Sequence, residues 1–131
     1  MLPLMNFLLK DKFKSIALIV SVGILYLSLI KIPIHESIQI KHLDKLQHGV
    51  AYATLCITWL IALQKKQKKY AIALCCILFG MIIEVLQYAI TNYRTGDYLD
   101  VAANSLGVLL GLLLFHQISK KNRLKKEKTS N

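Results

Sequence analysis

Acidic residues, prolines and paired cysteines are all scarce in this chain of 131 residues. Only 7 aspartates and glutamates stand against 17 lysines and arginines, which gives a formal net charge of +10. The 2 prolines and 6 glycines form no linker that would divide the chain, so we expect one domain. The 3 cysteines form no C-x-x-C pair and no Cys/His ligand spacing, which argues against a zinc site.

A basic face interleaved with aromatic residues, as in nucleic-acid-binding proteins, is also missing. The chain is 55% hydrophobic with a mean hydropathy of +0.48, and its positive charge is confined to short clusters between long uncharged runs. This arrangement favours a membrane protein with basic segments beside the bilayer. We therefore expect membrane lipids as partners and no nucleic acid.

Four apolar runs, residues 15–30, 49–63, 70–90 and 101–118, dominate the sequence. A hydrocarbon core about 30 Å thick requires about 20 helical residues. The second run must therefore extend upstream through Leu43–His48, and the fourth through Tyr98–Asp100, which brings charged residues to membrane depth. No small-x-small cleavage site follows the first run, which favours a retained span over a signal peptide. The predicted fold is all-α, an integral membrane bundle of four transmembrane helices.

The distribution of lysine and arginine predicts the orientation of this bundle. Thirteen of the 17 lie before the first run, between the second and third runs, or after the fourth. The positive-inside rule then places both termini in the cytoplasm, and four spans return the chain to its starting side. We divide the chain into a four-helix membrane domain, residues 1–118, and a basic cytoplasmic tail, residues 119–131. The tail contacts anionic lipid headgroups, is solvated and disordered, or does both.

Polar residues gather at the outer ends of the second, third and fourth predicted spans. Three clusters recur there: Asp44-Lys45-x-x-His48-x-x-x-Tyr52, Gly80-x-x-x-Glu84-x-x-Gln87 and Arg94-x-x-Asp97-x-x-Asp100-x-x-x-Asn104-x-x-Gly107-x-x-x-Gly111. Asp44, His48 and Tyr52 share one helix face, as do Glu84 and Gln87 on the next helix. Gly107 and Gly111, with Gly80 and Gly49, are typical of positions where helix backbones approach closely in lipid.

The charged members of these clusters admit two interpretations, because a charge in the bilayer needs a partner. They form either a structural ion-pair network, in which Lys45, Arg94 or His48 would pair with Glu84, or an outward-opening polar pocket.

Three chemistries fit such a pocket. Lys45 and Arg94 suit a phosphate or carboxylate headgroup, and His48, beside Asp44 or Glu84, suits a general base. A divalent cation would find oxygen ligands in Asp44, Glu84, Asp97 and Asp100. The spacing demands none of the three, so the metal and the cofactor stay unassigned.

Taken together, the three clusters resemble the VanZ-like family of bacterial membrane proteins. The resemblance covers about residues 43–114. It implies a multi-pass plasma-membrane protein of bacteria and a link to the cell envelope, because the family's named member is associated with low-level resistance to the glycopeptide teicoplanin. The resemblance therefore indicates the cellular process in which the protein acts, the response of the envelope to antibiotics, but no chemical reaction.

Three hypotheses follow for the function. The first is a non-enzymatic envelope protein whose pocket binds a lipid, a cell-wall precursor headgroup or the lipid tail of a glycopeptide. The second is a small membrane enzyme acting on a phosphate-bearing or acylated lipid, with His48 and Glu84 as catalytic residues. The third is a structural helix-bundle subunit of unassigned oligomeric state. The predicted ligand-binding residues are Asp44, Lys45, Tyr52, Gln87, Arg94, Asp97, Asp100 and Asn104.

Overall fold

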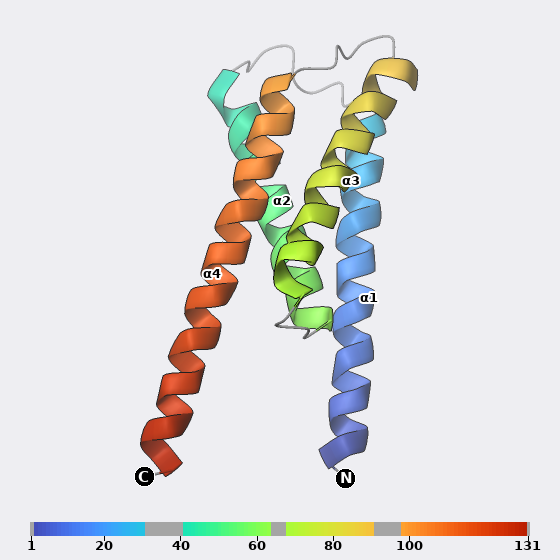
Figure 1. Cartoon of the computed structure of the whole chain (residues 1–131). Helices are drawn as coiled ribbons and strands as arrows, with labels where there is room; N and C mark the ends of the chain where they lie inside the picture. Colours follow the sequence, from blue (N-terminus) through green and yellow to red (C-terminus); the bar gives the residue numbers. More distant parts are fainter. Residues whose placement is uncertain (1, 31–40, 64–67, 91–97, 131) are drawn as a thin grey trace.

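The computed structural model describes residues 2–30, 41–63, 68–90 and 98–130, with side chains described from residue 12 and residue 45 onward in the first two ranges. These residues form four helices, α1 (Leu2–Leu29), α2 (Lys41–Leu63), α3 (Lys69–Ile90) and α4 (Tyr98–Ser130), shown in Figure 1. All four are long and apolar enough to cross a membrane. The all-α prediction with four candidate spans is therefore confirmed.

The upstream extensions of the second and fourth spans are present as helix. α2 begins at Lys41 and α4 begins at Tyr98, so the polar residues that precede both apolar runs belong to the helices. At about 1.5 Å per residue, the 23 residues of α2 measure about 35 Å, which is enough to cross a hydrocarbon core of about 30 Å.

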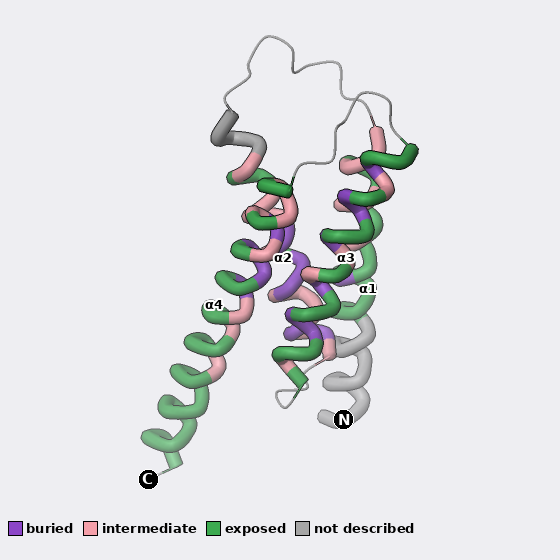
Figure 2. The backbone as a smooth tube through the Cα atoms, turned by 45° about the horizontal axis from the view of Figure 1, so that its top comes forward, coloured by how far each residue is buried: buried purple, intermediate pink, exposed green. Residues whose placement is uncertain are grey.

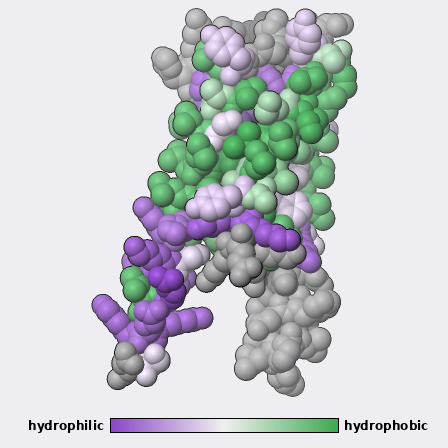
Figure 3. Space-filling model, in the orientation of Figure 1, coloured by the Kyte–Doolittle hydropathy of each residue, from purple (hydrophilic) through white to green (hydrophobic). Residues whose placement is uncertain are grey.

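α4 is longer than a bilayer requires. Its 33 residues measure about 50 Å at about 1.5 Å per residue, so the basic tail continues the fourth span as helix. Residues 120–130 are all exposed, and in Figures 1 and 3 this hydrophilic part of α4 extends past the apolar belt of the bundle. Arg123 and Glu127 lie one turn apart there, with Nε and Oε1 separated by 4.0 Å.

The four helices alternate in direction, so the two chain ends lie at the same end of the bundle (Figure 1). We call this the termini end, and the end where α2 and α4 begin the opposite end. α2 is central: it contacts each of the other three helices and packs most extensively against α4.

The interior is a small cluster of apolar side chains around α2. Figure 2 shows the buried residues along the inner faces of α2, α3 and α4. Large apolar side chains on the outer faces are exposed, as expected for a surface in contact with lipid, and they form the belt in Figure 3. The fully or nearly fully buried core consists of Tyr52, Leu55, Cys56, Leu60, Ile72, Ala73, Cys76 and Val108.

Small residues bring the backbones of α2 and α4 together. A Cβ added to Gly107 would lie 2.9 Å from Cα of Gly49, and one added to Gly111 would lie 2.8 Å from the carbonyl oxygen of Ala53. Real Cβ atoms do not approach other atoms this closely, so only glycine fits at both positions of α4. The predicted packing role of Gly107 and Gly111 is confirmed, and we call the contact formed by Gly49, Ala53, Gly107 and Gly111 the α2–α4 seam.

Candidate functional site

Polar side chains meet where the α2–α4 seam continues towards the opposite end, at which α2 and α4 begin. The close backbones hold the first turns of α4 beside the first turns of α2, so side chains from the two helices can pair directly. We call the group formed there and on the facing turn of α3 the polar cluster: Lys45, His48 and Tyr52 of α2, Glu84 of α3, and Asp100 and Asn104 of α4.

Lys45 and Asp100 form an ion pair between α2 and α4, joining Nζ to Oδ1. The Asp100 side chain is only 13% exposed and that of Lys45 is 31% exposed. Asp100 also lies in the first turn of α4, where the positive end of the helix dipole favours a carboxylate. A lysine and a helix terminus together therefore compensate a carboxylate that has little contact with solvent.

His48 is oriented by Asn104. The ring Nδ1 lies 3.0 Å from Asn104 Oδ1. Because an amide oxygen can only accept a hydrogen bond, His48 donates from Nδ1. A neutral His48 then carries an unprotonated Nε2, and this atom lies 3.9 Å from Asp100 Oδ2. The second ring nitrogen is thus held beside a carboxylate.

Tyr52 extends the cluster towards α3. Its side chain is 2% exposed, and within the part of the chain that the structure describes its hydroxyl is buried without a hydrogen-bond partner. The ring lies against Gly80, where an added Cβ would come within 2.9 Å of Cε1 and within 3.3 Å of Asn104 Nδ2. Gly80 therefore leaves the space that the ring occupies beside Asn104.

Glu84 lies one turn beyond Gly80 and is 7% exposed, on the buried stripe of α3. Its carboxylate is close enough to Tyr52 for the two groups to interact electrostatically. The predicted face shared by Gly80, Glu84 and Gln87 is confirmed, since all three are buried.

Gln87 ties α3 to α1. Its side chain is 2% exposed, and Nε2 donates a hydrogen bond of 2.8 Å to the backbone carbonyl of Ser28. Ser28 could not be predicted from the sequence, because a backbone acceptor leaves no trace in the residue pattern.

The structure also identifies a pairing that the sequence analysis missed. Lys45 was one of three candidate partners for Glu84, with Arg94 and His48, and its ion pair with Asp100, 55 positions along the chain, was not predicted. Lys45, His48 and Tyr52, spaced by 3 and 4 residues, share a helix face. That spacing was available in the sequence, but the pairing with Asp100 depends on the register of α2 against α4.

Other predicted site residues lie outside the described residues: Arg94, Asp97 and the side chain of Asp44. Among the side chains that are described, no three His, Cys, Asp or Glu residues gather closely enough to hold a metal ion. Of the charged groups expected to meet, the described residues bring Lys45, His48 and Asp100 together, and Glu84 is buried on the inner face of α3.

Comparison with known proteins gives one match. Residues 4–119 match the model of a protein family described as VanZ/LLP1, which covers most of the chain and all six residues of the polar cluster. No curated protein and no solved structure matches the chain.

Proposed function

Because the chain belongs to the VanZ/LLP1 family, we propose that this multi-pass membrane protein acts in the bacterial envelope by binding a polar headgroup at the polar cluster. The headgroup is that of a membrane lipid or of a lipid-linked cell-wall precursor. Binding at this position would contribute to the response to glycopeptides such as teicoplanin.

The observation that carries the proposal is the hydroxyl of Tyr52, which is buried without a partner among the described residues. A buried polar group left unsatisfied costs about 1–3 kcal/mol, so such groups are rare where they serve only the fold. The ring that carries this hydroxyl lies against Gly80, close to Asn104, and the hydroxyl is therefore suited to hydrogen-bond a ligand that enters the polar cluster. If the polar cluster were only a structural network, there would be no reason to retain a hydroxyl that lowers stability.

The charges of the cluster indicate which ligand groups suit it. Lys45 is a cation, Asp100 and Glu84 are carboxylates, and His48 and Asn104 add hydrogen-bonding groups. A headgroup with an anionic part would compete with Asp100 for Lys45, and its hydroxyl or amine groups would find acceptors in the carboxylates. A mixed set of this kind fits a headgroup that carries both charge and hydrogen-bonding groups.

The orientation we propose places both termini in the cytoplasm of a plasma-membrane protein, so that the polar cluster faces the envelope. The two chain ends share one end of the bundle (Figure 1), and the basic extension of α4 lies there. A cysteine introduced as Lys121→Cys should react with an impermeant label only after the membrane is opened. Labelling from the outside, above the background of the native cysteines, would reverse the orientation.

The test of the proposed function is Tyr52→Phe, which deletes one oxygen atom. If the hydroxyl binds a ligand, the variant should lose the teicoplanin resistance that the wild type gives a susceptible bacterial host, while its unfolding temperature in detergent stays the same or rises. Tyr88→Phe is the matched control, since Tyr88 is 71% exposed on the same bundle. Unchanged resistance in Tyr52→Phe would contradict the proposal.

A second candidate function, a membrane enzyme, is favoured by one observation. Asn104 holds the proton of His48 on Nδ1, so in the neutral ring the lone pair lies on Nε2, 3.9 Å from Asp100 Oδ2, in the arrangement of a general base beside a carboxylate. In this case lipids from cells expressing His48→Gln should lack a product that wild-type cells form, as measured by mass spectrometry. Gln47→Ala, which changes an exposed polar neighbour, is the control.

A further inference from the structure

A second group of polar side chains lies at the termini end, on the opposite side of the apolar belt from the polar cluster. Here the start of α3 faces α4 across a hollow of about 390 Å³. The lining residues are Lys69, Phe115, His116, Ser119, Lys120 and Arg123. Among the residues that the structure describes, the lining contains three cations and no carboxylate.

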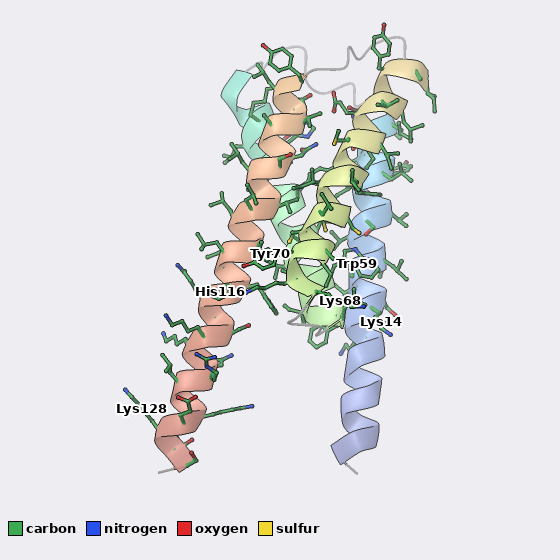
Figure 4. All side chains as sticks on the ribbon, in the orientation of Figure 1. Lys14, Trp59, Lys68, Tyr70, His116 and Lys128 are labelled. Atoms are coloured by element: carbon green, nitrogen blue, oxygen red, sulfur yellow. The ribbon has the colours of Figure 1, made fainter. Side chains whose placement is uncertain are left out.

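Lys69 and His116 are held together at the upper edge of this hollow. Nζ of Lys69 donates to Nδ1 of His116 over 2.9 Å and lies 5.2 Å from the centre of the Tyr70 ring. Figure 4 shows His116 and Tyr70 at the same level of the bundle. Because His116 accepts at Nδ1, the neutral ring carries its proton on Nε2 and offers a second donor.

The remaining lining groups are also donors. Ser119 offers a hydroxyl, Lys120 an ammonium and Arg123 a guanidinium. Arg123 has one carboxylate near it, Glu127 at 4.0 Å, but both side chains are about two-thirds exposed, and such a surface pair is weak. Lys69 is the first residue of α3, so the positive end of that helix dipole adds to the same potential. A ligand that satisfies this set is an anion with several acceptor oxygens, such as a phosphate group.

The position of the hollow indicates where such a phosphate would come from. Figure 3 shows the apolar belt giving way to hydrophilic residues along α4, and the lining residues from His116 to Arg123 follow the last apolar turns of that helix. Tyr70 is 69% exposed, as is typical of aromatic residues at a membrane interface. Leu113 and Leu114, about half exposed, lie just before the hollow on the same helix and present an apolar surface to acyl chains.

We infer that this hollow is a binding site for the phosphate of an anionic phospholipid in the leaflet next to the chain termini. It is separate from the polar cluster and does not depend on the function proposed there. The site differs from a diffuse basic surface because only some of the neighbouring lysines line it. Lys69 and Lys120 do, whereas Lys68 and Lys121 do not.

Two pairs of neighbouring lysines, Lys69 with Lys68 and Lys120 with Lys121, provide the test. The full chain in nanodiscs of phosphatidylcholine containing a fraction of phosphatidylglycerol would be analysed for retained phosphatidylglycerol by native mass spectrometry. Lys120→Gln and Lys69→Gln should each weaken retention about fivefold, the scale expected for one lysine at an anionic surface. Lys121→Gln and Lys68→Gln remove the same charge next to the site and should change it less than twofold.

Three outcomes would overturn the inference. Equal losses in both members of each pair would indicate a diffuse attraction to the basic surface. If phosphatidylcholine were retained as well as phosphatidylglycerol, binding would not require an anionic headgroup. Binding of inorganic phosphate with the same dependence on Lys120 and Lys69, without retained lipid, would exclude a lipid as the source of the phosphate.

Two further variants sharpen the test. His116→Phe removes the ring nitrogens and should weaken retention as Lys120→Gln does, with an unchanged unfolding temperature because His116 is exposed. Tyr52→Phe should leave retention unchanged, so a failure of this inference and a failure of the proposed function can be told apart.

Discussion

α4 and α1 both pack against α2, but they do so in different ways. Against α4, the backbones meet through Gly49 and Gly107, and the ion pair of Lys45 with Asp100 lies further along the same contact. Against α1, Gly23 has no atom within 4 Å of an added Cβ. Ala17 is the one buried residue among the described side chains of α1.

The contacts with α1 also include two described hydrogen bonds, in place of the ion pair that joins α2 to α4. Trp59 Nε1 donates to Ser21 Oγ over 3.0 Å, and Gln87 donates to the carbonyl of Ser28. Lipid tails are as apolar as leucine, so helices in a bilayer are held by close backbones and hydrogen bonds rather than by apolar burial. The α2–α4 seam has both features and positions the polar cluster, whereas the described contacts of α1 combine hydrogen bonds with the packing of Val20 and Ile24 and include no close approach at Gly23. The seam should therefore be the rigid part of the bundle.

The strongest test of this difference is to add one methyl group at Gly107, in the α2–α4 seam, and in a second variant at Gly23 of α1. Gly107→Ala would place a Cβ 2.9 Å from Cα of Gly49, and backbone atoms cannot move aside without separating the helices. We expect a loss of about 3 kcal/mol or more, at the upper end of what overpacking costs. Thermal unfolding in detergent measures it. Gly23→Ala should be neutral or slightly stabilising, and equal effects of the two variants would refute the distinction.

The next largest effect should come from the ion pair of the seam. Lys45→Met leaves Asp100 without its lysine, and removing one partner of a fully buried pair costs about 3–5 kcal/mol. Because Lys45 is 31% exposed, we expect about 1–2 kcal/mol here, again from thermal unfolding. The double variant Lys45→Met/Asp100→Leu should recover part of this loss. If it is no more stable than the single variant, the pair is not the source of the effect.

A smaller effect is expected at Asn104. Asn104→Ala removes the acceptor of His48 Nδ1 and should cost about 1 kcal/mol, the usual net value of a hydrogen bond. Nitrogen NMR of His48 should show the proton on Nδ1 in the wild type and a mixture of tautomers in the variant. Ser105→Ala is the control, because Ser105 bonds only the carbonyl of Val101 on its own helix among the contacts described. An unchanged His48 spectrum in Asn104→Ala would show that Asn104 does not orient the ring.

The smallest effect should appear at the contact with α1. Trp59→Phe removes the donor to Ser21 and should cost about 0.6 kcal/mol, the average for such bonds between membrane helices. Hydrogen exchange should rise in α1 and stay unchanged in α4. Thr54→Ala, which removes a bond within α2, should leave exchange in α1 unchanged. Increased exchange in both α1 and α4 would mean that α1 is not attached separately.

Much of the fold could be predicted because the bilayer imposes a length and a polarity on each helix. The extensions of α2 upstream to Leu43 and of α4 to Tyr98 follow from the number of residues needed to cross the core, and α2 begins two residues earlier still, at Lys41. The continuation of α4 to Ser130 could not be predicted, since residues 119–130 are polar and the bilayer sets no length for them.

The site was predicted in part, for a related reason. The expectation that Glu84 and Gln87 turn inward was correct, because a polar side chain on an apolar helix has no favourable place in lipid. The partners that Lys45 and Gln87 find in the structure were not predicted. A charge pattern along single helices cannot show that Lys45 reaches Asp100 or that Gln87 reaches the carbonyl of Ser28.

The amino-acid sequence by itself determined that the chain forms four apolar helices, which of their faces turn inward, and that its positive charge gathers beside the membrane. Each of these properties depends on residues close together along the chain and on the polarity of the surrounding lipid. The tertiary structure alone decided which polar groups meet, because that depends on the depth at which Gly107 settles against Gly49. A shift of one helical turn, about 5.4 Å, would separate Lys45 from Asp100 and His48 from Asn104 while leaving every helix intact.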